Sequence, residues 1–279
     1  MNVGFIGTGN MGRTLVEAFI RSGKLKPSDI IINNRTRSKA DRLAETHPGL
    51  RIADNSRELV RETPLFFLCI KPGEFRPVLD EIRETVRSEQ IAVSITSPVM
   101  IRDLEEWLPA KVAKIIPSIN HAVLAGNSLF VPGNRLTADD QQMLWNLFSA
   151  ISQPLRIEEE HTRIASDLAS CSPAFFAQLL ESLANTAVKE TGIPQSSALS
   201  LVNQMTQGLA RLLAEGGFTL QSLQERVAVP GGITREGLDL LNKEVSPVFH
   251  ELIQLTHAKY DHDVKKVKHS LGHTAKKNM

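Results

Sequence analysis

Three glycines near the N-terminus follow an apolar run at a chemically informative spacing. The run Val3-Gly4-Phe5-Ile6 predicts a strand, and Gly7, Gly9 and Gly12 follow it as GxGxxG, directly before a helical pattern. In this pattern the first glycine permits a sharp turn, the second lets backbone N–H groups approach a pyrophosphate, and the third lets the helix pack closely. The helix N-terminus adds unpaired N–H groups and a positive dipole. We therefore predict dinucleotide contacts from Gly7, Thr8, Gly9, Asn10, Met11 and Gly12.

The residues after the second expected strand, Ile30 to Ile32, indicate which dinucleotide is bound. An NAD site places Asp or Glu here for the ribose hydroxyls, whereas the 2′-phosphate of NADP needs basic and hydroxyl or amide donors. The chain has no carboxylate before Asp41. The alternative is that the two arginines of this loop are only solvated charges. We predict NADP (NADPH), with the 2′-phosphate contacted by Asn34, Arg35 and Thr36, and with Arg37 or Lys39 nearby.

Strand and helix patterns alternate up to about Ile157. The run Leu65 to Ile70 is apolar without alternation, which is typical of a strand buried on both faces. Because ligands lie beyond the carboxyl ends of parallel strands, we expect Ile70, Lys71 and Pro72 to border the cofactor. Lys71 is equally consistent with a solvated turn residue. The alternation predicts an α/β fold that begins with a Rossmann-type, doubly wound parallel sheet.

From about Glu158 the strand patterns stop and long helical patterns replace them. We expect a Rossmann domain over 1–157 and an all-α domain over 158–279. Its helices are expected over Pro173–Glu190, Pro194–Ala214 and Pro247–Tyr260. Their apolar stripes are wider than one small bundle needs, which favours a homodimer or higher oligomer formed through these helices. The core of a monomeric helical domain is the alternative.

The segment from Pro230 to Gly237 is a candidate carboxylate site. Proline, two glycines and then Thr234, which can start a helix, form a turn with several free N–H groups and a hydroxyl. The turn is therefore a candidate site for binding a carboxylate. An ordinary turn at a helix start is an equal alternative.

The overall composition favours a small-molecule partner. The formal net charge is +1, and no stretch has the apolar length of a membrane span, so we expect neither nucleic acid nor membrane. The single cysteines Cys69 and Cys171 and the lack of a signal-peptide pattern indicate a cytoplasmic protein. The basic end after Asp261 is expected to be a solvated, partly disordered tail. His269 and His273 lack carboxylate or cysteine partners, so we expect no metal.

These motifs together resemble the pyrroline-5-carboxylate reductase family, and more narrowly its ComER-type relatives from late-competence operons. The resemblance covers nearly the whole chain and is most specific at two motifs, Asn34-Arg35-Thr36 and Pro230-Gly231-Gly232-Ile233-Thr234. Further motifs that carry it are the Gly-rich turn, Ile70-Lys71-Pro72, Val93-Ser94-Ile95, Ile116-Pro117 and Ser172-Pro173-Ala174-Phe175.

The resemblance implies a Rossmann domain followed by a helical dimerisation domain. It implies hydride transfer from NADPH to the C=N carbon of a cyclic imino acid, giving proline. The substrate carboxylate would bind at Gly231 to Thr234, the imine nitrogen at the Thr234 hydroxyl, and the nicotinamide beside Pro117 and Ser118. Because an iminium carbon is already electrophilic, alignment and water exclusion supply most of the catalysis. The residues taken as catalytic on this resemblance are Thr234 and Ser172.

The chain departs from the family pattern around the expected substrate. It has Ser118-Ile119-Asn120-His121 in place of Asn-Thr-Pro-Ala, Ser170-Cys171-Ser172 in place of Gly-Ser-Gly, and Ile233 in place of the first Thr of Pro-Gly-Gly-Thr-Thr. His121 is either a substrate contact or a loop residue without a role. The altered loops support one alternative, a nicotinamide-binding protein with a regulatory, competence-associated role. A second alternative is a 3-hydroxyacid-type dehydrogenase, which shares a Rossmann domain followed by helices and would use Lys189 as the catalytic lysine.

Overall fold

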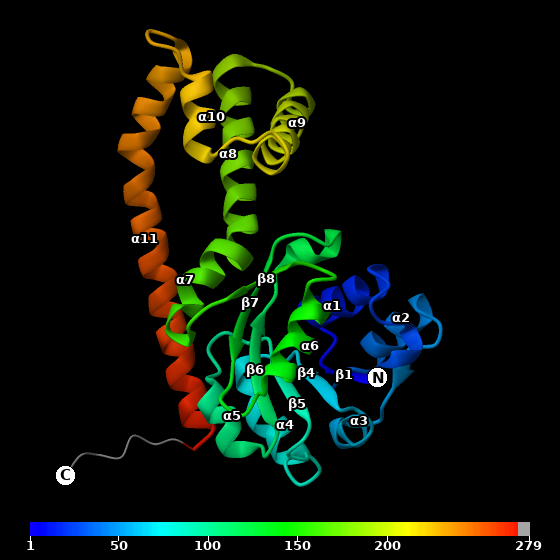
Figure 1. Cartoon of the computed structure of the whole chain (residues 1–279). Helices are drawn as coiled ribbons and strands as arrows, with labels where there is room; N and C mark the ends of the chain where they lie inside the picture. The colour runs from blue at the N-terminus through cyan, green and yellow to red at the C-terminus, as the bar shows by residue number, and fades with distance from the viewer. Residues whose placement is uncertain (273–279) are drawn as a thin grey trace, which may run out of the picture. The chain divides into compact units, whose positions relative to one another are not determined.

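The computed structural model describes residues 1–272 and contains one eight-stranded sheet (Figure 1). The spatial order is β3-β2-β1-β4-β5-β6-β7-β8. The chain runs outward from β1 to β3 and then crosses back to β4, so the strand order reverses between β1 and β4, which is the topological switch point of the sheet. The strands are β1 Val3–Ile6, β2 Ile30–Asn33, β3 Arg51–Ile52, β4 Leu65–Leu68, β5 Ile91–Ser94, β6 Lys111–Ile116, β7 Asn127–Pro132 and β8 Gln153–Arg156.

The predicted doubly wound α/β sheet is confirmed, with one local difference. Strand β7 pairs antiparallel with β6 and parallel with β8, whereas the other neighbouring strands of the sheet are parallel. The connection from Pro117 to Gly126 holds only a short 3₁₀ helix, η3 Ile119–Val123. A parallel crossover needs roughly a dozen residues or more. The short connection therefore returns the chain in the opposite direction.

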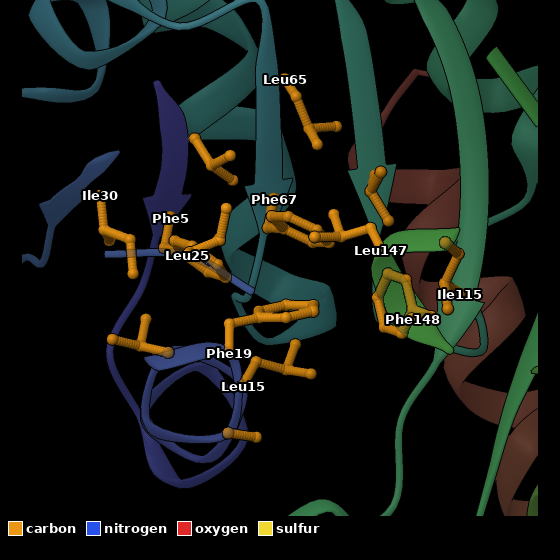
Figure 2. Close-up of a cluster of buried hydrophobic side chains, with 14 of the residues drawn as sticks. Phe5, Leu15, Phe19, Leu25, Ile30, Leu65, Phe67, Ile115, Leu147 and Phe148 are labelled. Atoms are coloured by element: carbon orange, nitrogen blue, oxygen red, sulfur yellow. The ribbon is translucent and has the colours of Figure 1, made fainter. Parts of the chain in front are cut away.

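Helices cover both faces of the sheet, and each face has its own hydrophobic core. One core packs α1 Asn10–Arg21, α2 Arg37–Thr46 and α6 Ala138–Phe148 against the sheet. Figure 2 shows its aromatic centre, where Phe5 stacks on Phe67 with ring centroids 4.7 Å apart and Phe19 meets Phe148 edge to face. The other core lies under α3 Ser56–Glu62, α4 Phe75–Ile82 and α5 Ile101–Trp107. Together the two cores fix the carboxyl ends of the strands.

The contacts divide the chain into two compact units. Among the described residues, the first unit holds Met1–Cys171 and residues 256–272, and the second is Ser172–Leu255. The sequence placed the boundary at 157/158 instead. The difference arises because α7 Thr162–Ser166 and a π-helical turn, Asp167–Cys171, pack with the unit that contains the sheet. The last part of α11 also belongs to that unit.

The second unit is helical and exposes much of its apolar surface. It contains α8 Ser172–Thr191, α9 Gln195–Ala214, α10 Leu220–Val227 and the first part of α11 Ile233–Ser270. The hydrophobic residues buried in it are Ala184, Ala198 and Ala228, all of them small. Helix α10 was not predicted, although the Thr219 hydroxyl accepts from the Ser222 N–H, which is an N-cap signal in the sequence. Among residues 1–272 we find no helix with the length and apolarity needed to cross a bilayer.

The predicted last helix, Pro247–Tyr260, is wrong in both bounds. Helix α11 begins at Ile233, contains Pro247 and continues to Ser270. The part of the predicted flexible tail up to Ser270 is helical because Val267 and Leu271 are buried in the core under α3 to α5. The other predicted tail residues His273, Lys276 and Lys277 lie outside the described residues.

Candidate functional site

The three glycines of the opening turn have three different surroundings. Gly7 has φ +98°, and a Cβ on it would lie 2.4 Å from the Cys69 carbonyl oxygen. A Cβ on Gly12 would lie 2.2 Å from the Gly7 carbonyl oxygen. A Cβ on Gly9 would meet nothing within 4 Å. Gly7 and Gly12 are therefore required by the fold, whereas Gly9 leaves open space in front of the helix.

The start of α1 is suited to an anion. Its N-cap Gly9 offers no side-chain cap, and its first turn, which begins with Asn10 and Met11, has no acidic residue. The N–H of Thr8 donates to Asn34 Oδ1 at 2.9 Å, while the buried Thr8 hydroxyl has no partner among the described residues. Free N–H groups and the positive helix dipole thus point toward the space beside Gly9.

A cavity of about 570 Å³ extends from this turn along the end of β2. Thr36 is the N-cap of α2, and its side chain makes no capping bond there. Asn34 Nδ2 donates to the Thr36 carbonyl oxygen at 2.9 Å and so shapes the loop. The cavity lining includes Gly7, Gly9, Asn34, Arg35, Thr36, Lys39, Ile70 and Lys71. A hydroxyl, an amide, an arginine and a lysine in one cavity fit the 2′-phosphate of NADP.

The structure distinguishes the two candidate cations beyond Thr36. The Arg37 guanidinium binds Asp41 at 3.1 Å and Asp54 at 3.0 Å, and these hydrogen bonds raise its pKa. Lys39 lines the cavity, and Arg37 is not among the lining residues. Lys39 is therefore the better candidate for the phosphate.

The residues after β4 close the other side of the cavity. Ile70 follows the strand, and its carbonyl oxygen accepts from the Thr96 hydroxyl at 2.8 Å. Lys71 lines the cavity and precedes the 3₁₀ helix η2 Pro72–Glu74. Burial raises the pKa of the Cys69 thiol, so this side chain stays protonated and neutral in the wall.

The loop after β6 is held by the π-helical turn. Ser118 is buried, and its hydroxyl donates to the Ala169 carbonyl oxygen at 2.9 Å. The Ser170 hydroxyl donates to the Pro117 carbonyl oxygen at 2.8 Å. These two hydrogen bonds hold Pro117 and Ser118 in place, so the Ser118 hydroxyl has a structural role. The predicted substrate contact of these residues stays a prediction.

His121 has a structural role that the sequence did not reveal. Its ring is buried, with Nδ1 3.1 Å from the Ala125 carbonyl oxygen and Nε2 accepting from the Ser118 N–H. Nε2 is also 2.9 Å from the Ser128 hydroxyl. These partners match a neutral imidazole that carries its proton on Nδ1, and burial lowers its pKa.

We expect this histidine to make the protein less stable in mild acid. The unfolded chain takes up a proton near the ordinary pKa of 6.5, whereas the folded ring resists protonation. The free energy of unfolding should therefore fall as the pH drops below about 6.5, by up to about 1.4 kcal/mol per pH unit, until the folded pKa is reached. Urea denaturation between about pH 5 and pH 7 measures this slope. His121→Gln should reduce it, and the exposed His161→Gln is the control; equal slopes in both variants would contradict the assignment.

The predicted carboxylate turn belongs to the second unit. Gly231 has φ +72°, and the Gly232 N–H donates to the Val229 carbonyl oxygen at 3.0 Å. Helix α11 begins at the next residue, Ile233, whose side chain is 93% exposed, and Thr234 is exposed as well. Ser172 is the first residue of α8 in the same unit. The cofactor cavity, Pro117 and Ser118 lie in the first unit, and the roles of Ser172 and Thr234 stay predictions.

Sequence reasoning missed two ion pairs of the first unit, each of which has one buried partner. The Asp167 carboxylate in the π-helical turn binds Arg163 Nη2 at 2.6 Å and accepts from the Thr256 hydroxyl at 2.8 Å. Lys114 is fully buried in β6 and binds Glu159 Oε1 at 2.6 Å. Burial lowers the pKa of the Lys114 ammonium against the opposing effect of Glu159. The available signal in the sequence was a lysine within the otherwise apolar run from Val112 to Ile116.

Two family models match different parts of the chain. The family model described as pyrroline-5-carboxylate reductase dimerisation matches residues 159–262, and the one described as NADP oxidoreductase, coenzyme F420-dependent, matches residues 2–98. ComE operon protein 4 of Bacillus subtilis is 40% identical over 96% of this chain and 98% of that protein. Pyrroline-5-carboxylate reductase 3 of Danio rerio is 32% identical over 87% of this chain and 84% of that protein.

Two solved structures share the fold along nearly the whole chain. A pyrroline carboxylate reductase from Plasmodium falciparum with NADP bound has a TM-score of 0.79 at 22% identity and covers 98% of both chains. A pyrroline-5-carboxylate reductase from Coxiella burnetii has a TM-score of 0.80 at 23% identity and covers 96% of this chain and 98% of that one. With the Gly-rich turn, the cavity beside Arg35 and the helical unit in place, the chain belongs to the pyrroline-5-carboxylate reductase family of NADP-dependent oxidoreductases.

Proposed function

We propose that the protein reduces a cyclic imino acid, most simply pyrroline-5-carboxylate, to the corresponding amino acid, L-proline. The observation that carries the proposal is the cofactor cavity, in which the open space beside Gly9 continues to the donors Arg35, Thr36 and Lys39. Family membership supports the substrate class, since relatives of this chain are named pyrroline-5-carboxylate reductases. NADPH supplies the hydride when it is bound.

Different segments of the chain bind the cofactor and the substrate. The N–H groups at the start of α1 hold the pyrophosphate, and Arg35, Thr36 and Lys39 hold the 2′-phosphate. Ile70 to Pro72 and the fixed loop of Pro117 and Ser118 border the nicotinamide. The turn Gly231 to Ile233 binds the substrate carboxylate through the backbone N–H groups of Gly231 and Ile233, while the Gly232 N–H shapes the turn by donating to the Val229 carbonyl oxygen. The Thr234 hydroxyl hydrogen-bonds the imine nitrogen, which is protonated in the product amine. Alignment of the C=N carbon with the nicotinamide and exclusion of water account for most of the rate acceleration.

Self-association belongs to the same proposal. Helices α8, α9 and α11 expose large apolar side chains, among them Leu183, Leu201 and Leu240. A matching family model for dimerisation covers this region. We propose that a second copy of the chain covers these side chains in a homodimer or a higher oligomer.

The test is NADPH oxidation with pyrroline-5-carboxylate, combined with a fluorescence titration of NADPH in the same preparation. Thr234→Val, which removes the hydroxyl and keeps the shape, should lower kcat by about tenfold or more and leave NADPH affinity unchanged. Thr206→Val is the matched control, because its hydroxyl only bonds the Val202 carbonyl of its own helix. Binding of NADPH without turnover of any cyclic imino acid would refute the proposal and favour the regulatory alternative.

The dehydrogenase alternative makes a different prediction at one residue. Lys189 is exposed on α8 and would have to act as the catalytic lysine. Family membership favours the reductase. Full activity in Lys189→Ala would remove the dehydrogenase alternative.

A further inference from the structure

A carboxylate stands beside the arginine that we assign to the 2′-phosphate. Glu74 Oε1 lies 2.7 Å from Arg35 Nη1, and both residues line the cofactor cavity. The other carboxylate oxygen, Oε2, accepts from the Lys71 N–H at 3.3 Å. Glu74 ends the 3₁₀ helix η2 just before α4, so its backbone is held by regular structure. The sequence showed no acidic residue at the end of β2, but the fold supplies one from another strand connection.

The other carboxylates of the cavity wall have different partners. Asp54 pairs with Arg37 at 3.0 Å. Glu81 accepts from the Ser56 N–H at 2.8 Å and so fixes the start of α3. Among residues 1–272, Glu74 is therefore the carboxylate of the cavity wall that forms an ion pair with Arg35, the predicted phosphate-binding residue.

We propose that Glu74 is a specificity-determining residue that competes with the 2′-phosphate for Arg35. The inference rests on the proposed phosphate role of Arg35. A 2′-phosphate carries close to two negative charges, so its binding requires the guanidinium to exchange Glu74 for the phosphate. NADH has an uncharged ribose hydroxyl at this position and needs no such exchange. Glu74 thus reduces the preference for NADPH over NADH that Arg35 alone would create.

The experiment is a fluorescence titration of wild type and Glu74→Gln with NADPH and with NADH. The variant should bind NADPH about three- to tenfold more tightly, because an exposed ion pair contributes little but its removal frees the arginine, while the NADH dissociation constant should change by less than about twofold. Glu62→Gln is the matched control, since Glu62 forms a similarly exposed pair with Arg51 at 2.6 Å outside the cavity. It should leave both dissociation constants unchanged.

A double variant separates this mechanism from simple charge repulsion. In an Arg35→Gln background, Glu74→Gln should lose most of its effect on NADPH affinity because no arginine is left to release. An unchanged effect in that background, an equal gain for NADH, or no gain at all would overturn the proposal. Direct titration also keeps it distinct from the proposed reaction, whose failure would appear as missing turnover in protein that still binds NADPH.

Discussion

Gly9→Val is expected to weaken NADPH binding by about a hundredfold while the thermal midpoint of unfolding stays close to that of the wild type. Gly9 has φ −68° and ψ −171°, an extended conformation that any residue adopts, and its Cβ would enter open space. The free protein therefore tolerates the side chain. The bound pyrophosphate does not, because valine occupies the space through which the first N–H groups of α1 reach it. Loss of charge-assisted hydrogen bonds of about 1.5–3 kcal/mol each accounts for this magnitude.

Gly12→Ala is the informative contrast for that measurement. Its Cβ would lie 2.2 Å from the Gly7 carbonyl oxygen, so helix and turn would have to separate. This variant should lose stability, whereas Gly9→Val should lose affinity only. Differential scanning calorimetry combined with NADPH titration separates the two effects. A Gly9→Val protein that binds NADPH as tightly as the wild type would show that the dinucleotide does not pass this turn.

Lys114→Met is expected to lower the free energy of unfolding by about 1–3 kcal/mol, because the ion pair and hydrogen bonds of Lys114 are lost while the remaining Glu159 carboxylate is partly exposed to water. Lys114 is fully buried, its Nζ binds Glu159 Oε1 at 2.6 Å, and it also donates to the Ser97 carbonyl oxygen at 3.2 Å. Methionine fills a similar volume but leaves the Glu159 carboxylate without its cation. Urea denaturation gives the loss directly.

The matched control for that variant is Lys111→Met in the same strand. Lys111 pairs with Asp140 at 2.7 Å, but the Lys111 side chain is partly exposed whereas Lys114 is fully buried, so about 1 kcal/mol or less is expected. A second variant, Lys114→Met with Glu159→Gln, should recover part of the loss because the uncompensated charge is gone. Equal losses at Lys111 and Lys114 would contradict the assigned burial effect.

Much of the cofactor site could be predicted because its requirements are local. Gly7 is needed for a positive φ, and Gly12 for a close approach between residues only a few positions apart. Strand patterns such as Leu65 to Leu68 reflect burial on both faces, and that burial is a direct consequence of the parallel sheet. The basic loop after β2 likewise needs no distant partner to indicate a phosphate.

The tertiary structure alone decided the features that depend on distant partners. Contacts with Ala169 and Ser128 bury Ser118 and His121 and give both residues structural roles that the sequence did not indicate, while the predicted contact of Ser118 beside the nicotinamide stays a prediction. Helix α11 is longer than predicted because Val267 packs into a core formed by distant segments of the chain. The hydrophobic periodicity of the sequence does not indicate that contact.

The electrostatics of the cavity were decided in the same way. The sequence indicated that Arg35 and its neighbours form a basic loop, because the residue types of a short segment can be read directly from the sequence. In the folded chain, Glu74 from the connection after β4 lies beside the Arg35 guanidinium. Arg37 forms ion pairs with Asp41 and Asp54 instead of lining the cavity. Charge pairing acts across space between segments far apart in the chain, so the sequence alone determined the kind of site, and the tertiary structure determined which charges the cofactor meets.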